Sequence, residues 1–126
     1  MKMQESPEDY LEAIFVLSKE LGNVRSIDVA NHLGYSKPSI SVAMKRLREN
    51  GYLHIDDSSH LLLTDAGLSI AQNIYEKHQV LTCFLLSIGV SKETAKKDAC
   101  RIEHVISDES FEKLKKLSQI KNCDSP

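Results

Sequence analysis

Apolar residues recur along most of this chain at intervals of three and four positions, which is the period of an amphipathic helix. Six such stretches are visible, at about residues 7–21, 26–33, 36–50, 65–88, 91–106 and 108–117. Residues that commonly cap or end helices stand at their boundaries: Ser6, Ser26, Ser36, Thr64 and Ser91 at the starts, and Gly22, Gly34, Gly51 and Gly89 at the ends. The pattern predicts a mainly α-helical protein.

The second and third predicted helices are short and meet at a tight turn around Gly34, which is the pattern of a helix-turn-helix. Two short apolar runs follow, Tyr52–Ile55 and Leu61–Thr64, with the polar stretch Asp56–His60 between them. Runs of this kind around a short polar stretch predict a β-hairpin. A hairpin directly after a helix-turn-helix indicates a small wing.

The pattern therefore divides the chain into two parts. We expect residues 1–64 to form an N-terminal winged helix-turn-helix domain and residues 65–126 to form an all-helical dimerisation domain. In the second part, we expect the apolar stripe from Ala71 to Leu85 to pair two subunits.

Composition limits the class of protein. With 126 residues, 41% of them hydrophobic, the chain can build one compact unit or two small ones. No apolar run approaches the roughly 18 to 20 residues that span a bilayer, so we expect a soluble protein with no membrane partner. The three cysteines, Cys83, Cys100 and Cys123, are far apart, which favours a reducing, cytoplasmic setting. No role is assigned to Cys83 or Cys123.

The charges are unevenly distributed along the chain. The formal net charge is −2, but residues 22–55 carry five Lys or Arg against two acids. The outer side of the third helix combines cations with small hydroxyl groups, a mixture that suits phosphates and base edges. A merely solvated face is the alternative. The residues that we expect to contact DNA are Arg25, Ser36, Lys37, Pro38, Ser39, Ser41, Lys45, Arg46 and Arg48.

A second group of residues suggests metal binding. Cys100, Glu103 and His104 stand at i, i+3 and i+4, so on a helix their side chains would point to one place. Asp9 and Glu12 form an acidic pair at i and i+3, and His78 interrupts an apolar stripe. A lone His in such a stripe is ordinarily a core residue with a backbone hydrogen bond. Together, however, the six side chains favour a divalent cation as their shared partner.

Four segments carry a family resemblance: Glu8–Glu12, Ser36–Ser39, Leu63–Gly67 and Lys97–Glu109. With the order of helix, helix-turn-helix, wing and long helix, the chain resembles the diphtheria toxin repressor family of iron- or manganese-dependent regulators. The resemblance implies a homodimeric repressor that binds palindromic operators of metal-uptake genes when loaded with Mn(II) or Fe(II). It also implies that Asp9, Glu12, His78, Cys100, Glu103 and His104 are metal ligands.

Within the family the chain combines features of two branches. Its length, without a C-terminal SH3-like domain, and its Asp9/Glu12 pair resemble the manganese transport regulators, which have a glutamate in place of Cys100. Cys100 resembles the iron-dependent branch. That branch builds an ancillary site from His78 and two residues whose places are taken here by Thr82 and Lys96, which are poor ligands. We therefore expect His78 to join Asp9, Glu12 and Glu103.

Two other functions are consistent with parts of the sequence. A winged-helix regulator could respond to an organic ligand or to thiol oxidation, with Cys100 as the sensor. A metallohydrolase could use the same ligands around a metal-bound water. The short chain leaves little room for a substrate cleft, and no separate general base stands out, so we expect no enzymatic activity.

Overall fold

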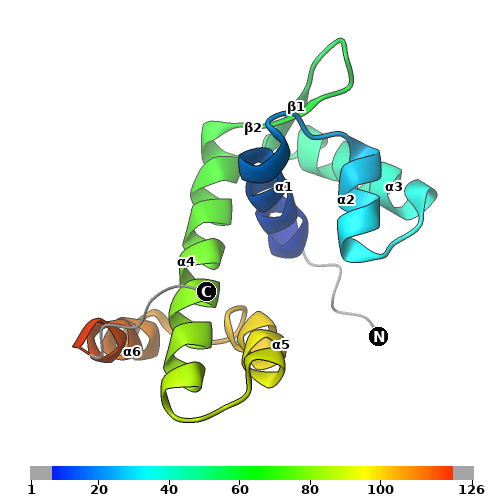
Figure 1. Cartoon of the computed structure of the whole chain (residues 1–126). Helices are drawn as coiled ribbons and strands as arrows, with labels where there is room; N and C mark the ends of the chain where they lie inside the picture. The colour runs from blue at the N-terminus through cyan, green and yellow to red at the C-terminus, as the bar shows by residue number, and fades with distance from the viewer. Residues whose placement is uncertain (1–6, 121–126) are drawn as a thin grey trace. The chain divides into compact units, whose positions relative to one another are not determined.

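The computed structural model describes residues 7–120, with side chains placed up to residue 118. Its elements follow the order α1 (Pro7–Leu21), α2 (Ser26–Leu33), α3 (Lys37–Glu49), β1 (Leu53–Ile55), β2 (Leu61–Leu63), α4 (Asp65–Ser87), α5 (Lys92–Ile102) and α6 (Asp108–Ile120) (Figure 1). The predicted mainly helical architecture with a single hairpin is confirmed. None of the described helices is long and apolar enough to cross a membrane.

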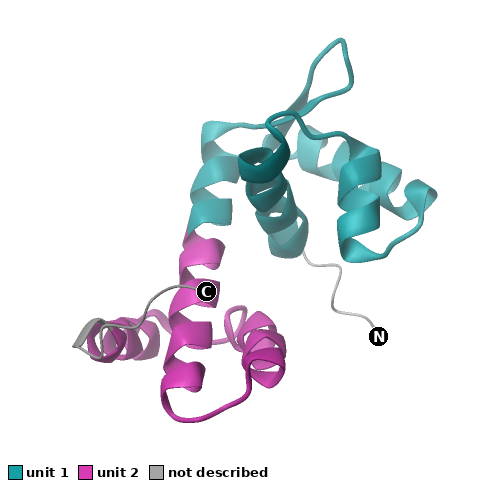
Figure 2. Cartoon of the chain, viewed as in Figure 1, with its two compact units in different colours: residues 1–72 teal, residues 73–126 magenta. Residues whose placement is uncertain are grey.

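The chain forms two compact units, residues 1–72 and 73–126, and the boundary falls within α4 (Figure 2). Unit 1 contains α1, α2, α3, the hairpin and the start of α4. Its core is mainly aliphatic, as the scarcity of aromatic residues requires, and the large side chains that are 1% exposed or less include Leu11, Ile14, Val29, Ile40 and Met44. These residues come from the first three helices, so the helix-turn-helix packs on α1.

The turn between α2 and α3 depends on Gly34. This residue has a φ of 75°, in the left-handed region that glycine adopts without a steric penalty. Its backbone N–H and that of Tyr35 both donate to the carbonyl oxygen of Ala30, at 2.8 and 3.1 Å, which ends α2. The Ser36 hydroxyl then accepts from the backbone N–H of Ser39 and starts α3, as predicted.

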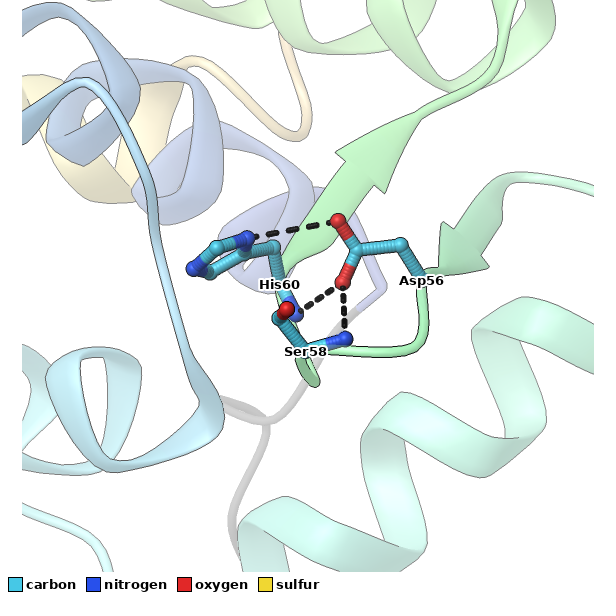
Figure 3. A network of polar contacts seen from close by, with 3 residues as sticks. All are labelled: Asp56, Ser58 and His60. Atoms are coloured by element: carbon cyan, nitrogen blue, oxygen red, sulfur yellow. Dashed lines mark hydrogen bonds and ion pairs between the residues drawn. The ribbon is translucent and has the colours of Figure 1, made fainter.

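The wing is an antiparallel pair in which Leu53 faces Leu63 and Ile55 faces Leu61. Its loop is organised by one carboxylate, as Figure 3 shows. One oxygen of Asp56 accepts hydrogen bonds from the backbone N–H groups of Ser58 and His60, at 2.9 and 2.8 Å. The other lies 3.2 Å from Nδ1 of the His60 ring.

Unit 2 consists of the remainder of α4 with α5 and α6. Its buried apolar residues include Ile74, Leu81, Ala95, Ala99 and Phe111. The stripe of α4 that we expected to pair subunits is largely inside the fold, because Ala71, Ile74 and Leu81 are buried within this chain. A subunit contact through this stripe would be left to its partly exposed members, such as Leu85, and remains a prediction.

Three helix boundaries also differ from the predictions. Arg25, rather than Ser26, occupies the N-cap position of α2, and its backbone N–H donates to Asp28 at 2.9 Å. The fifth helix ends at Ile102, four residues early, and α6 continues to Ile120. The predicted cap at Ser6 lies outside the described residues.

Candidate DNA-recognition helix and metal centre

The exposed side of α3 carries the polar residues expected from the sequence. Ile40, Met44 and Leu47 form the buried side of the helix, so the cationic side chains lie on its opposite, exposed side. All nine side chains predicted to contact DNA, from Arg25 to Arg48, are exposed in unit 1. The geometry therefore leaves the whole predicted set accessible to a ligand.

One exposed residue of α3 was missed by the sequence analysis. Val42 lies between Ser41 and Lys45 and is 53% exposed, although it is apolar. It borders a hollow of about 240 Å³ whose lining also includes Pro7, Tyr10, Arg46 and Tyr52. The available signal was its position, because Val42 falls outside the inward stripe formed by Ile40, Met44 and Leu47.

Unit 2 gathers three of the predicted metal ligands. Donor atoms of His78, Cys100 and Glu103 all lie within 4.8 Å of one another. Nδ1 of His78 is 3.0 Å from Oε1 of Glu103 and 3.8 Å from the Cys100 sulfur. An imidazole, a thiol and a carboxylate at this separation match the donor types of a Zn(II), Fe(II) or Mn(II) site.

Glu103 lies at the centre of this group. It is 1% exposed, and its Oε2 atom is buried without a hydrogen-bond partner among the described residues. The His104 ring lies beside this oxygen, with Nε2 at 3.6 Å, beyond good hydrogen-bonding range. A buried carboxylate oxygen without a donor is unfavourable, and a coordinated cation would satisfy it. The donor set therefore fits a divalent metal.

The charge state of His78 follows from these neighbours. Hydrogen bonds to Cys100 and to Glu103 raise the pKa of His78 from 6.5 to about 10, against the opposing effect of burial. The imidazolium thus occupies the place of a cation beside Glu103 in the metal-free protein. A metal ion would have to displace that proton, because only the neutral imidazole is a ligand.

The three ligands from Cys100 to His104 do not share one helix, as the sequence spacing suggested. Cys100 lies on α5, Glu103 is the residue that follows its last turn, and His104 lies in the turn beyond. The helix ends because the backbone N–H groups of His104 and Val105 bond three residues back, to Arg101 and Ile102. The turn nevertheless keeps Glu103 beside His78.

Asp9 and Glu12 belong to unit 1. Both lie on the first turns of α1, one turn apart, and both are half-buried. Of the six predicted ligands, the structure thus groups His78, Cys100, Glu103 and His104 in unit 2. Participation of Asp9 and Glu12 in the same site remains a prediction.

Comparison with known proteins identifies two family domains in the chain. Residues 2–61 match the N-terminal DNA-binding domain of iron-dependent repressors, and residues 64–124 match their metal-binding and dimerisation domain. The transcriptional regulator MntR of Escherichia coli O6:H1 is 37% identical over 112 residues, which are 89% of this chain and 72% of the relative. The regulator MntR of Geobacillus kaustophilus is 34% identical over 114 residues, which are 90% of this chain and 81% of the relative.

Solved structures give the same result. The metal-dependent transcriptional regulator MtsR superposes with a TM-score of 0.85 at 27% identity, over 93% of this chain and 55% of that one. The manganese regulator SloR superposes with a TM-score of 0.80 at 28% identity, over 90% of this chain and 54% of SloR. The chain spans about half the length of these two proteins. It belongs to the iron-dependent repressor family, that is, the diphtheria toxin repressor family of metal-dependent transcription regulators, and to its manganese transport regulator branch.

Proposed function

We propose that this protein is a cytoplasmic homodimer that represses metal-ion uptake genes when loaded with Mn(II) or Fe(II). The observation that carries the proposal is the buried Glu103 carboxylate. Its Oε2 atom has no hydrogen bond within the described part of the chain, while two imidazoles and a thiol lie beside it. Family membership supports a regulator rather than an enzyme.

In this proposal residues 1–64 bind double-stranded DNA and residues 65–126 bind metal and dimerise. The exposed face of α3 enters the major groove of a palindromic operator. Lys37, Lys45, Arg46 and Arg48 contact phosphates, while Ser36, Pro38, Ser39 and Ser41 approach base edges. Arg25, at the N-cap position of α2, reaches the phosphate backbone beside them.

His78, Cys100, Glu103 and His104 would hold the metal from unit 2, and Asp9 and Glu12 would hold it from α1 of unit 1. A bound divalent cation would supply the positive charge that this mainly anionic ligand set lacks. Ligands on both units would fix the orientation of the DNA-binding unit. In a two-fold dimer that orientation sets the spacing of the recognition helices, which must match successive major grooves roughly 34 Å apart. By linkage, DNA would then tighten metal binding.

The leading alternative is a winged-helix regulator that responds to an organic ligand or to thiol oxidation. The exposure of Cys100 is the observation that favours it, because an accessible thiol can be oxidised. Thiol titration with and without Mn(II) separates the two functions, since a ligating thiol is protected by metal and a free sensor is not. A phosphoesterase screen tests the metallohydrolase alternative.

The decisive experiment measures binding to duplexes that the metal-loaded protein selects from a random pool, with Mn(II), Fe(II) or chelator present. We expect tight binding only with metal. The Lys45→Ala variant should bind all sequences more weakly and lower the slope of log affinity against log salt by about one unit. Lys92→Ala, an exposed lysine of unit 2, is the matched control. An unchanged affinity and salt slope for Lys45→Ala would remove this residue from the interface.

A second experiment addresses the choice of metal. A thiolate is softer than a carboxylate, so Cys100 should broaden activation toward Fe(II), whereas Cys100→Glu should narrow it toward Mn(II). Co(II) offers a readout that does not depend on DNA, because a thiolate ligand gives an intense near-ultraviolet absorption that Cys100→Glu must lack. If both proteins rank Mn(II) and Fe(II) identically under anaerobic conditions, Cys100 does not determine selectivity.

A further inference from the structure

The exposed face of α3 has an apolar centre. Val42 is 53% exposed on this helix, and no other large hydrophobic residue of α3 is exposed to that degree. Pro38 and Arg46 lie one turn before and one turn after it, so the three side chains follow one line along the helix surface. Exposing an isopropyl group in the middle of a polar face is unfavourable in the free protein, and a bound partner would cover it.

The surroundings of Val42 identify the kind of partner. The helix carries Lys37, Lys45, Arg46 and Arg48 against a single acid, Glu49, so its complement is anionic. Lys45 and Arg46 lie within one turn of Val42. A ligand that fits this face must therefore present an apolar group within about one helical turn of negative charge.

DNA presents that combination in its major groove. Phosphates line the groove, and the 5-methyl group of thymine is the apolar group that its base edges display. Between Ser36 and Arg46 the sequence contains no Asn or Gln to read adenine and no acid to accept from cytosine. Base discrimination in this stretch is thus left to hydroxyl groups, cations and the apolar side chains of Pro38 and Val42.

We infer that Val42 is a specificity-determining residue that packs on the 5-methyl group of a thymine in each operator half-site. This inference rests on the proposed function and adds to it the chemical feature that is read at the centre of the recognition helix. Arg46, one turn further along α3, would hold a phosphate beside that thymine.

The test replaces single thymines by uracil, which removes only the 5-methyl group, in duplexes that the Mn(II)-loaded wild type selects from a random pool. For the wild type we expect one thymine per half-site whose replacement weakens binding about fourfold, the factor that corresponds to burying one methyl-sized group. The Val42→Ala variant should bind thymine and uracil duplexes equally at that position. Alanine is a good helix former, so this exposed substitution should leave the fold intact.

Ile27→Ala, which shortens an exposed apolar side chain of α2 that has no assigned DNA contact, is the matched control and should keep the wild-type preference for thymine. The inference is overturned if the wild type tolerates uracil at every position, or if Val42→Ala keeps the same penalty at the same thymine. A failure of the proposed function gives another result. The wild type would then bind no duplex in a metal-dependent way, and the role inferred for Val42 would be contradicted as well.

Discussion

At the scale of single residues, Glu103 organises the candidate metal centre because it brings a carboxyl group into a buried position. Its partners in the metal-free protein are two imidazoles, from His78 at 3.0 Å and from His104 at 3.6 Å. The ligand types could be predicted from the sequence, because Cys, Glu and His within five positions are an unusual group. The geometry of these side chains could not be predicted. The i, i+3, i+4 spacing places them together only on a continuous helix, and α5 ends at Ile102.

The first prediction concerns the proton on His78. The metal-free fold holds this proton up to about pH 10, whereas the unfolded chain releases it near 6.5. The interaction with Glu103 and Cys100 therefore stabilises the metal-free protein fully below pH 6.5 and is lost as the pH rises through about 10. We expect the free energy of unfolding to fall between about pH 7 and about pH 9, by at most about 1.4 kcal/mol per pH unit.

Urea unfolding of chelated protein measures this slope. The His78→Gln variant should lose most of it, and His60→Gln in the wing should keep it. Metal affinity should rise over the same range, since the ion competes with the proton. Equal slopes for wild type and His78→Gln would show that His78 is not protonated in the fold.

The second prediction concerns Gly67 in the first turn of α4. A β-carbon at this position would overlap the backbone carbonyl oxygen of Tyr52. That carbonyl also accepts a hydrogen bond from the backbone N–H of Thr64 at 3.1 Å, so it is not free to rotate away. We expect Gly67→Ala to destabilise unit 1 by about 1–3 kcal/mol, despite the better helix propensity of alanine.

The measurement is the free energy of unfolding in urea, with Ser69→Ala in the same helix as the control. Ser69 is exposed, so its substitution should change stability by less than about 0.5 kcal/mol. Equal stabilities for the two variants would mean that Tyr52 and α4 can move apart without lowering the free energy of unfolding.

At the scale of elements, the accuracy of the predictions follows the strength of the local signals. The bounds of α1 and α3 were predicted well, because a proline or a serine cap starts each helix and a left-handed glycine follows its end. The end of α5 was not predicted well, because residues 102–107 contain neither glycine nor proline, which commonly mark the end of a helix. The helix stops there with backbone bonds to Arg101 and Ile102 and with the Glu103 side chain buried, which are features of the folded unit.

The wing provides the third prediction. Hydrogen bonds from the backbone of His60, then from Ser58 and the His60 ring, lower the pKa of Asp56 from 3.8. The ionised carboxylate thus orders the loop above the usual titration range of Asp, and this order is lost as the pH falls through the lowered pKa of the folded state. Asp56→Ala should remove the order at all pH values.

Amide hydrogen exchange measured by NMR checks this prediction. The backbone amides of Ser58 and His60 should exchange faster in Asp56→Ala than in the wild type. Asp57→Ala is a close control, because this neighbouring carboxylate is exposed and the hydrogen bonds from Ser58 and His60 go to Asp56. Unchanged protection in Asp56→Ala would show that the strands alone hold the loop.

At the scale of the whole molecule, the sequence predicts a DNA-binding part and a metal-binding part, because each part has its own pattern, and this division of roles stays a prediction. The surface that joins two subunits could not be predicted in the same way. Apolar periodicity in α4 marks any buried face, and much of this face, including Ala71, Ile74 and Leu81, is buried within the chain. Among the residues of unit 2 whose side chains the structure describes, the large apolar ones that remain exposed are Ile88, Val105 and Leu117.

The last prediction is that metal is required for specific DNA binding but not for dimerisation. Ile88, Val105 and Leu117 are 58%, 81% and 40% exposed, and none of them is a metal ligand type. Burial of exposed apolar surface between two copies does not need an ion. We therefore expect chelated protein to sediment as a dimer, with Mn(II) changing its DNA affinity and leaving its mass unchanged. Glu103→Gln should behave like chelated wild type in both measurements. A chelated monomer that dimerises when Mn(II) is added would show that the ion builds the dimer, and the proposal that metal orients units within an existing dimer would have to be abandoned.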